Sequence, residues 1–269
     1  MHTRRSFTVC CFLCGLLSGI LWFIFAGGAG NFAHGDDPPA VKIDETGRYE
    51  WRADHDVNGI GKFYLGREIA HVMGFAAAPW LERPEREREE KTTAMIESLK
   101  LKPGMTVADI GAGSGVITLK MAAKVGDTGK VYAVDIQQEM LDLLSDKLSR
   151  LDVKNVDLVL CTNKSPKLPA ASLDLAIMVD VYHELEYPYE AMLELSKCMK
   201  PGGRIVLVEF RKEDPEVRIK LVHKMTQAQA KRELAPKEFG LKWKETIGVL
   251  PWQHVIVFER QKETLGVRD

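Results

Sequence analysis

The stretch from Val107 to Gly115 places the strongest constraint on how this chain of 269 residues can fold. It reads VADIGAGSG: apolar residues enclose Asp109 and are followed by glycines at 111, 113 and 115. A helical pattern of apolar residues starts at Val116, so the glycines are predicted to form a turn between a strand and a helix. Open parallel α/β sheets bind ligands at such turns, because the first N–H groups of the helix are free.

The spacing of the glycines differs from that of a dinucleotide-binding loop. The dinucleotide fingerprint needs its third glycine at position 116, where Val116 stands, and here the third glycine is Gly115. Asp109 would repel a pyrophosphate, whereas a carboxylate suits a ligand that carries an ammonium group. The loop therefore favours a partly cationic ligand over NAD, and a nucleotide-dependent oxidoreductase is disfavoured.

A second carboxylate follows the next predicted strand, Lys130 to Asp135. The 24 residues from Gly111 to Asp135 fit one strand–helix–strand unit, and a carboxylate in this position commonly holds ribose hydroxyls. A ribose and an amino-acid head together indicate S-adenosylmethionine.

Three ordered motifs carry a family resemblance: DIGAGSG at 109–115, AVD at 133–135 and KPGGRIVLVE at 200–209. Over about residues 100–260 the chain resembles the class I S-adenosylmethionine-dependent methyltransferases, with a layout similar to quinone-biosynthesis enzymes and other small-molecule methyltransferases. The resemblance implies a Rossmann-like three-layer α/β/α sandwich whose seven-stranded, mostly parallel sheet has an antiparallel last strand. The cofactor-binding residues we expect are Asp109, Gly111, Ala112, Gly113, Gly115, Asp135, Ile136, Asn163 and Asp180.

The pattern of apolar residues agrees with this fold. It predicts strands at 105–110, 130–135, 155–160, 173–179 and 204–209, alternating with helices at 114–125, 137–150 and 187–199. A helix at 226–234 and strands at 242–249 and 254–258 complete the methyltransferase domain, which we place at 100–262.

The N-terminus suggests export. Residues 6–25 carry no charge and follow a short basic segment, so residues 1–35 are either a cleaved signal peptide or a membrane anchor. Either reading places the domain in the cell envelope, in the periplasm or on the outer face of the inner membrane. The sequence Thr3-Arg4-Arg5-Ser6-Phe7 is similar to a twin-arginine signal, although an ordinary basic region would read the same.

The next segments are expected to connect and cover the domain. Residues 36–58 read as a tether, and residues 59–99 as a helical cap, because Ile69, Val72 and Met73 have helical spacing. Such a cap would shape the acceptor pocket, so we expect substrate contacts from Tyr64, Arg67, Trp80 and Tyr182.

The end of the predicted strand 173–179 carries the candidate catalytic residues. Asp180 and His183 should face the methyl group, and His183 is the candidate base. The alternative is a histidine that only forms hydrogen bonds at a strand end. The pattern H-E-x-x-H fails because Tyr187 replaces the second histidine, so the sequence predicts no metal site.

The charge composition restricts the classes of molecule that the chain could bind. A formal net charge of −1 gives no broad basic surface for nucleic acid. We therefore expect an exported or membrane-anchored methyltransferase that acts on a small-molecule or lipid-like acceptor. The alternative is a noncatalytic envelope module that binds S-adenosylmethionine.

Overall fold

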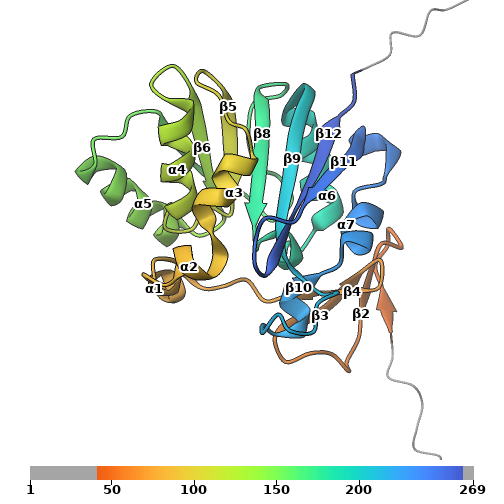
Figure 1. Ribbon diagram of the computed structural model, residues 1–269. Helices are drawn as coiled ribbons and strands as arrows, with labels where there is room; N and C mark the ends of the chain where they lie inside the picture. Colours follow the sequence, from red (N-terminus) through yellow and green to blue (C-terminus); the bar gives the residue numbers. More distant parts are fainter. Residues whose placement is uncertain (1–40, 263–269) are drawn as a thin grey trace, which may run out of the picture. The chain divides into compact units, whose positions relative to one another are not determined.

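The computed structural model describes residues 41–262, and their largest element is a mostly parallel sheet (Figure 1). Its strands lie in the order β11-β12-β9-β8-β5-β6-β7, with β10 paired to β9. β12 is antiparallel to both neighbours, β11 and β9. The strands are β5 (Thr106–Ile110), β6 (Lys130–Asp135), β7 (Val156–Leu160), β8 (Leu173–Val179), β9 (Met199–Arg211), β10 (Lys224–Met225), β11 (Leu241–Ile247) and β12 (Gln253–Arg260).

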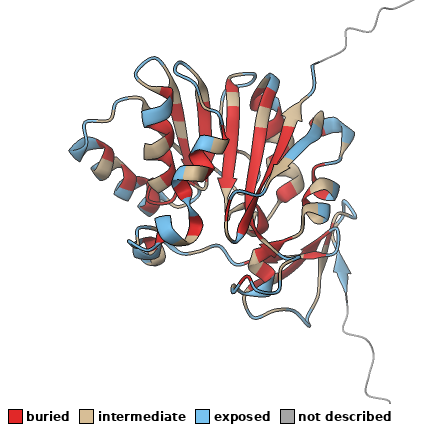
Figure 2. Cartoon of the chain, viewed as in Figure 1, coloured by how far each residue is buried: buried red, intermediate tan, exposed pale blue. Residues whose placement is uncertain are grey.

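Helices cover both faces of this sheet, because successive side chains of a strand point to opposite faces. In β8, Leu175 and Ile177 belong to one apolar cluster with residues of α3 (Thr92–Ser98) and α4 (Val116–Val125). Ala176 and Met178 belong to another, with residues of α6 (Pro188–Cys198) and α7 (Gln227–Glu233). α5 (Gln138–Arg150) packs beside β6 and β7. Figure 2 shows the central strands almost wholly buried, and the expected three-layer sandwich is confirmed.

The order of the strands creates a crevice at one edge of the sheet. β5 pairs with β6 on one side and with β8 on the other, so the connections after these strands lead in opposite directions. Open α/β sheets bind ligands at this switch point, outside the carboxyl ends of the strands. The glycine-rich loop follows β5, Asp135 ends β6, and Asp180 follows β8.

The N-terminal part of the described chain is a second sheet, which corrects the expected helical cap. Four antiparallel strands lie in the order β1 (Lys42–Ile43), β2 (Tyr49–Trp51), β3 (Gly59–Tyr64) and β4 (Arg67–Ala70). A helix is therefore wrong for residues 59–70, and the segment expected to be a tether contains β1 and β2. The helical spacing was misleading because Ile69 is buried in β4, whereas Val72 and Met73 follow the strand outside any helix and Val72 is exposed.

Short helices follow this sheet and reach the glycine-rich loop. They are η1 (Phe75–Ala77), α1 (Ala78–Leu81) and α2 (Arg86–Glu90). Lys147 Nζ donates to Ser114 O at 2.7 Å and lies 2.6 Å from Glu82 Oε1, which holds the end of α1 against the loop. The remaining short helices are η2 (Tyr182–Glu184), η3 (Leu221–His223) and η4 (Lys237–Phe239).

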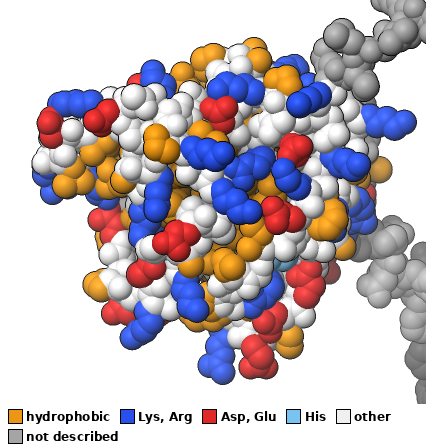
Figure 3. Space-filling model, turned by 45° about the horizontal axis from the view of Figure 1, so that its top comes forward, with side chains coloured by type: hydrophobic (Ala, Val, Ile, Leu, Met, Phe, Trp, Pro, Cys, Tyr) orange, Lys and Arg blue, Asp and Glu red, His pale blue; other side chains and the backbone are white. Residues whose placement is uncertain are grey.

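The surface carries mixed charge. On the face shown in Figure 3, basic side chains are spread among acidic and hydrophobic ones. Within residues 41–262 no helix has the length and apolar character needed to cross a membrane. The predicted signal or anchor at 1–35 lies outside the described residues.

Candidate cofactor and acceptor site

A cavity of about 850 Å³ opens at the carboxyl edge of the central sheet. One end is lined by the glycine-rich loop, Asp135 and Asn163, and the other by His183, Phe210 and His223. The volume suits a nucleoside-sized ligand together with a small second molecule, since ligand pockets span about 300–1,000 Å³.

The glycine-rich loop approaches the cavity with bare backbone. Gly111 and Gly113 have φ of +74° and +52°, a region that L-residues rarely adopt. A Cβ on Gly111 would lie 2.5 Å from Val181 Cγ2, and one on Gly113 would lie 2.8 Å from Leu81 Cδ1. The backbone at these two positions, which we call the glycine cradle, therefore packs closely against Val181 and Leu81, and a larger residue at either position would collide with them.

Asp135 is fixed at the end of β6 with its carboxylate beside this cradle. Its Oδ2 accepts from Gly113 N at 2.8 Å and its Oδ1 from Gln137 N at 2.9 Å. Burial raises the pKa of Asp135. Each oxygen retains a lone pair for a ribose hydroxyl, and the partly exposed Ile136 lines the same part of the cavity. These groups fit the adenosine part of S-adenosylmethionine.

Three of the predicted cofactor residues shape the loop from behind. Asp109, Ala112 and Gly115 do not line the cavity. Asp109 is 2% exposed and accepts a hydrogen bond of 2.6 Å from Thr118 Oγ1, and burial raises its pKa to about 6. Its place beneath the loop differs from the expected contact with a ligand's ammonium group.

Asp180 follows β8 and lines the middle of the cavity. Its φ of +56° is left-handed, which turns the chain sharply at the strand end. Gln253 Nε2 donates to its Oδ2 at 3.3 Å, while its buried Oδ1 has no hydrogen-bond partner within residues 41–262. Burial raises the pKa of Asp180 well above its ordinary value. Asp180 is therefore a buried carboxyl in the cavity wall, with one oxygen that no described residue pairs.

His183 is the centre of a buried hydrogen-bond network. Its Nδ1 lies 2.5 Å from Glu209 Oε2, and Glu209 Oε1 accepts from Tyr182 N at 3.0 Å. Burial raises the pKa of Glu209 to about 8. His183 Nε2 lies 3.1 Å from His223 Nδ1. Burial lowers the pKa of His183 to about 4, so the imidazole is neutral at pH 7.

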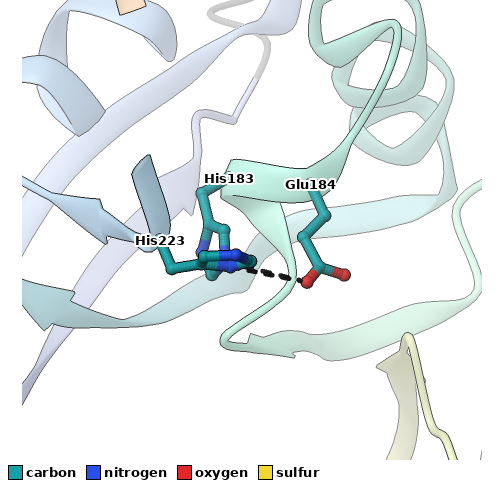
Figure 4. Close-up of side chains that lie close together, drawn as sticks. All are labelled: His183, Glu184 and His223. Atoms are coloured by element: carbon teal, nitrogen blue, oxygen red, sulfur yellow. Dashed lines mark hydrogen bonds and ion pairs between the residues drawn. The ribbon is translucent and has the colours of Figure 1, made fainter. Parts of the chain in front are cut away.

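A further carboxylate and a second histidine complete this end of the site. Glu184 Oε1 lies 3.9 Å from His183 Nε2 and 3.8 Å from His223 Nδ1. Figure 4 shows these three side chains converging from η2 and η3. His223 and Glu209 were not among the sequence candidates, because no motif connects positions 183, 209 and 223.

Only one of the four predicted substrate residues reaches the cavity. Trp80 of α1 lines it, whereas Tyr64, Arg67 and Tyr182 do not. Tyr64 packs against Tyr49 with ring centres 5.5 Å apart, and Tyr182 is fully buried. Arg67 pairs with Glu233 of α7, so this side chain joins the N-terminal sheet to the domain.

The fold and this edge of the sheet together define a Rossmann-like protein that binds a nucleoside cofactor in its glycine-rich crevice. The family described as "Methyltransferase domain" matches residues 101–255. The chain therefore belongs to the class I S-adenosylmethionine-dependent methyltransferases, and its cofactor is S-adenosylmethionine.

Curated relatives resemble the chain in sequence, and a solved structure resembles it in fold. The chain is 31% identical over 127 residues to the ubiquinone/menaquinone biosynthesis C-methyltransferase UbiE of Shewanella pealeana, covering 47% of this chain and 51% of the relative. The corresponding enzyme of Pseudoalteromonas translucida is 32% identical over 123 residues, or 45% and 49%. The chain thus spans about half the length of the curated relatives it matches. A methyltransferase structure from Aquifex aeolicus has a TM-score of 0.65 and 24% identity, covering 70% of this chain and all of that one.

Proposed function

We propose that this protein transfers the methyl group of S-adenosylmethionine to a small, ring-bearing acceptor of the quinol class. The observation that carries the proposal is the single cavity that extends from Asp135 and the glycine-rich loop to the polar groups at His183. One end fits the cofactor, and the other leaves space for a second molecule. The names of the UbiE relatives suggest a quinone precursor as that molecule.

Methyl transfer needs alignment more than acid–base power. The cofactor supplies a methyl group on a positively charged sulfonium. The acceptor's nucleophilic atom forms a bond to the methyl carbon as the sulfur–carbon bond breaks, and the electron pair of that bond remains on sulfur as a neutral thioether. A nucleophile that starts with a proton loses it. Asp180 in its ionised form is our candidate proton acceptor, because this residue lines the cavity and its raised pKa makes its carboxylate a stronger base.

Apolar groups would hold the acceptor ring. Trp80 of α1, Phe210 of β9 and Ile219 line the cavity and offer apolar surface to such a ring. Residues 73–75, which precede α1, are hydrogen-bonded to Gln137. Gln137 Oε1 accepts from Phe75 N and Gln137 Nε2 donates to Met73 O, both at 2.9 Å. This segment would exclude water from the reacting atoms.

The test is a transfer assay with the full chain and S-adenosylmethionine carrying a labelled methyl group. The acceptors offered are benzoquinols and naphthoquinols that lack one ring methyl group, with catechols, simple phenols and thiols as comparison classes. We expect label in a quinol product, with mass spectrometry placing it on carbon or oxygen. Binding of the cofactor without transfer to any class would contradict the proposal and favour a noncatalytic module.

We also propose that residues 1–35 direct the protein to the cell envelope as a signal peptide or anchor. The support is the uncharged stretch at 6–25 after a basic segment. Fractionation of native cells should find the protein in the envelope, and the mass of its N-terminus distinguishes a cleaved signal from an anchor. A protein found wholly in the cytoplasmic fraction would contradict the proposal, and export lost in an Arg4→Lys/Arg5→Lys variant would identify the twin-arginine route.

A further inference from the structure

We propose that His183, Glu184 and His223 bind a divalent transition-metal ion of the zinc type at the acceptor end of the cavity. The sequence predicted no metal site, because the second histidine comes from η3 and lies 40 residues beyond His183. Two imidazoles and one carboxylate form the ligand set of several catalytic zinc sites. Imidazole nitrogens favour transition metals over Mg²⁺ and Ca²⁺, which take oxygen ligands.

The geometry of the three donor atoms fits such an ion. His183 Nε2 lies 3.1 Å from His223 Nδ1, and Glu184 Oε1 lies 3.9 Å from the first nitrogen and 3.8 Å from the second. A point equidistant from all three atoms lies about 2.1 Å from each, which agrees with Zn–N and Zn–O bonds of about 2.0–2.2 Å. The spacing of the three donor atoms therefore matches an ion of this size.

Partners outside the cluster orient two of the three ligands. With the proton of His183 on Nδ1, which lies 2.5 Å from Glu209 Oε2, the lone pair of Nε2 is directed at the cluster. Met73 N donates to Glu184 Oε2 at 3.4 Å, which leaves Oε1 facing the histidines. A metal-bound histidine that donates its other N–H to a carboxylate is the usual supporting arrangement in metal sites.

The ion would keep an open coordination position. All three ligands line the cavity, so a fourth ligand would come from the bound acceptor. An oxygen of a quinol or catechol placed there would lose its proton more readily, because the positive ion stabilises the anion. This role rests on the proposed function, whereas binding of the ion does not.

Calorimetric titration of the metal-free full chain with Zn²⁺ alone tests the site. We expect one ion per chain, and visible absorption with Co²⁺ as a second probe should show low-symmetry coordination with nitrogen ligands. His223→Ala and Glu184→Gln should each weaken Zn²⁺ binding at least about tenfold. The matched controls are Glu186→Gln, which changes a neighbouring carboxylate on the same cavity, and His55→Ala, which removes a histidine 3.2 Å from Glu68 in the N-terminal region.

The results of these titrations test the metal site independently of the proposed methyl transfer. Titration of each variant with S-adenosylmethionine shows that it is folded, since the cofactor end is untouched. Absence of Zn²⁺ binding would overturn the inference and leave a direct His183–His223 hydrogen bond. Binding that falls equally in the controls, or that persists in His223→Ala and Glu184→Gln, would overturn it as well. Tight Zn²⁺ binding without methyl transfer would support the site and contradict the proposed function.

Discussion

Arg67 of β4 and Glu233 of α7 form a buried, bidentate ion pair. Arg67 Nε donates to Glu233 Oε1 and Nη2 donates to Oε2, both at 2.8 Å, while Nη1 donates to His183 O at 3.1 Å. One side chain thus joins the N-terminal sheet, the outer helix layer and the strand end that carries His183. The sequence suggested an acceptor contact for Arg67, and the structure instead shows that this residue fixes the N-terminal sheet beside the site.

We predict that Arg67→Met lowers the free energy of unfolding by about 3–5 kcal/mol, because the carboxylate of Glu233 would stay buried without its partner. The double variant Arg67→Met/Glu233→Leu should recover most of that loss, since both charges are then gone. Urea unfolding followed by circular dichroism measures each value. Lys130→Met, which breaks the exposed ion pair with Asp157, is the control and should change little. Equal unfolding midpoints for Arg67→Met and the control would refute the predicted role.

The glycine cradle predicts a difference between two substitutions at positive φ. Gly111 and Gly104 have φ of +74° and +84°, so alanine at either costs about 1–2 kcal/mol of backbone strain. Only at Gly111 does the Cβ also collide, 2.5 Å from Val181 Cγ2; at Gly104 the nearest atom is 3.7 Å away. Gly111→Ala should therefore cost about 1–3 kcal/mol more in free energy of unfolding. If urea titration gives the same loss of free energy of unfolding for both variants, the close approach of Val181 to Gly111 is wrong.

The buried carboxyl of Asp109 predicts a pH-dependent stability. Burial raises its pKa from 3.8 to about 6 in the folded protein, so the folded state binds the proton more tightly than the unfolded state. The stability that this group contributes is complete below pH 3.8 and is lost as pH rises through 6. Relative to wild type, Asp109→Asn should gain about 1 kcal/mol between about pH 5 and pH 7. Urea unfolding of the cofactor-free protein at both pH values measures the gain. If the variant and the wild type differ by the same free energy of unfolding at both pH values, the raised pKa of Asp109 is contradicted.

The central sheet could be predicted from sequence because its signals are local. Strand β8, predicted at 173–179, forms at Leu173–Val179, since a mostly apolar run indicates a buried strand whichever strands pair with it. The glycine-rich turn and Asp135 follow strands directly, so the parallel sheet brings them together. These elements follow from the local pattern of apolar residues and from the parallel topology that alternating strands and helices impose.

The N-terminal sheet and the acceptor end could not be predicted in the same way. Lys62 of β3 is 2% exposed, with Nζ 3.3 Å from the ring centre of Tyr187, and a buried lysine in a short strand reads as a surface residue in the sequence. His223 meets His183 only because η3 returns to the edge of the sheet. Both arrangements rest on contacts between distant segments, which leave no periodic signal.

The crevice at Asp135 should bind S-adenosylmethionine, and calorimetric titration of the full chain with this cofactor measures that binding. Asp135→Asn removes the charge and one acceptor that would face the ribose, while Asp157→Asn makes the same change on the neighbouring strand β7, away from the cavity. We predict one site per chain, at least about tenfold weaker in Asp135→Asn, which is about 1.4 kcal/mol or more, and unchanged in Asp157→Asn. No binding by the wild-type protein, or equal affinity in Asp135→Asn, would contradict the claim.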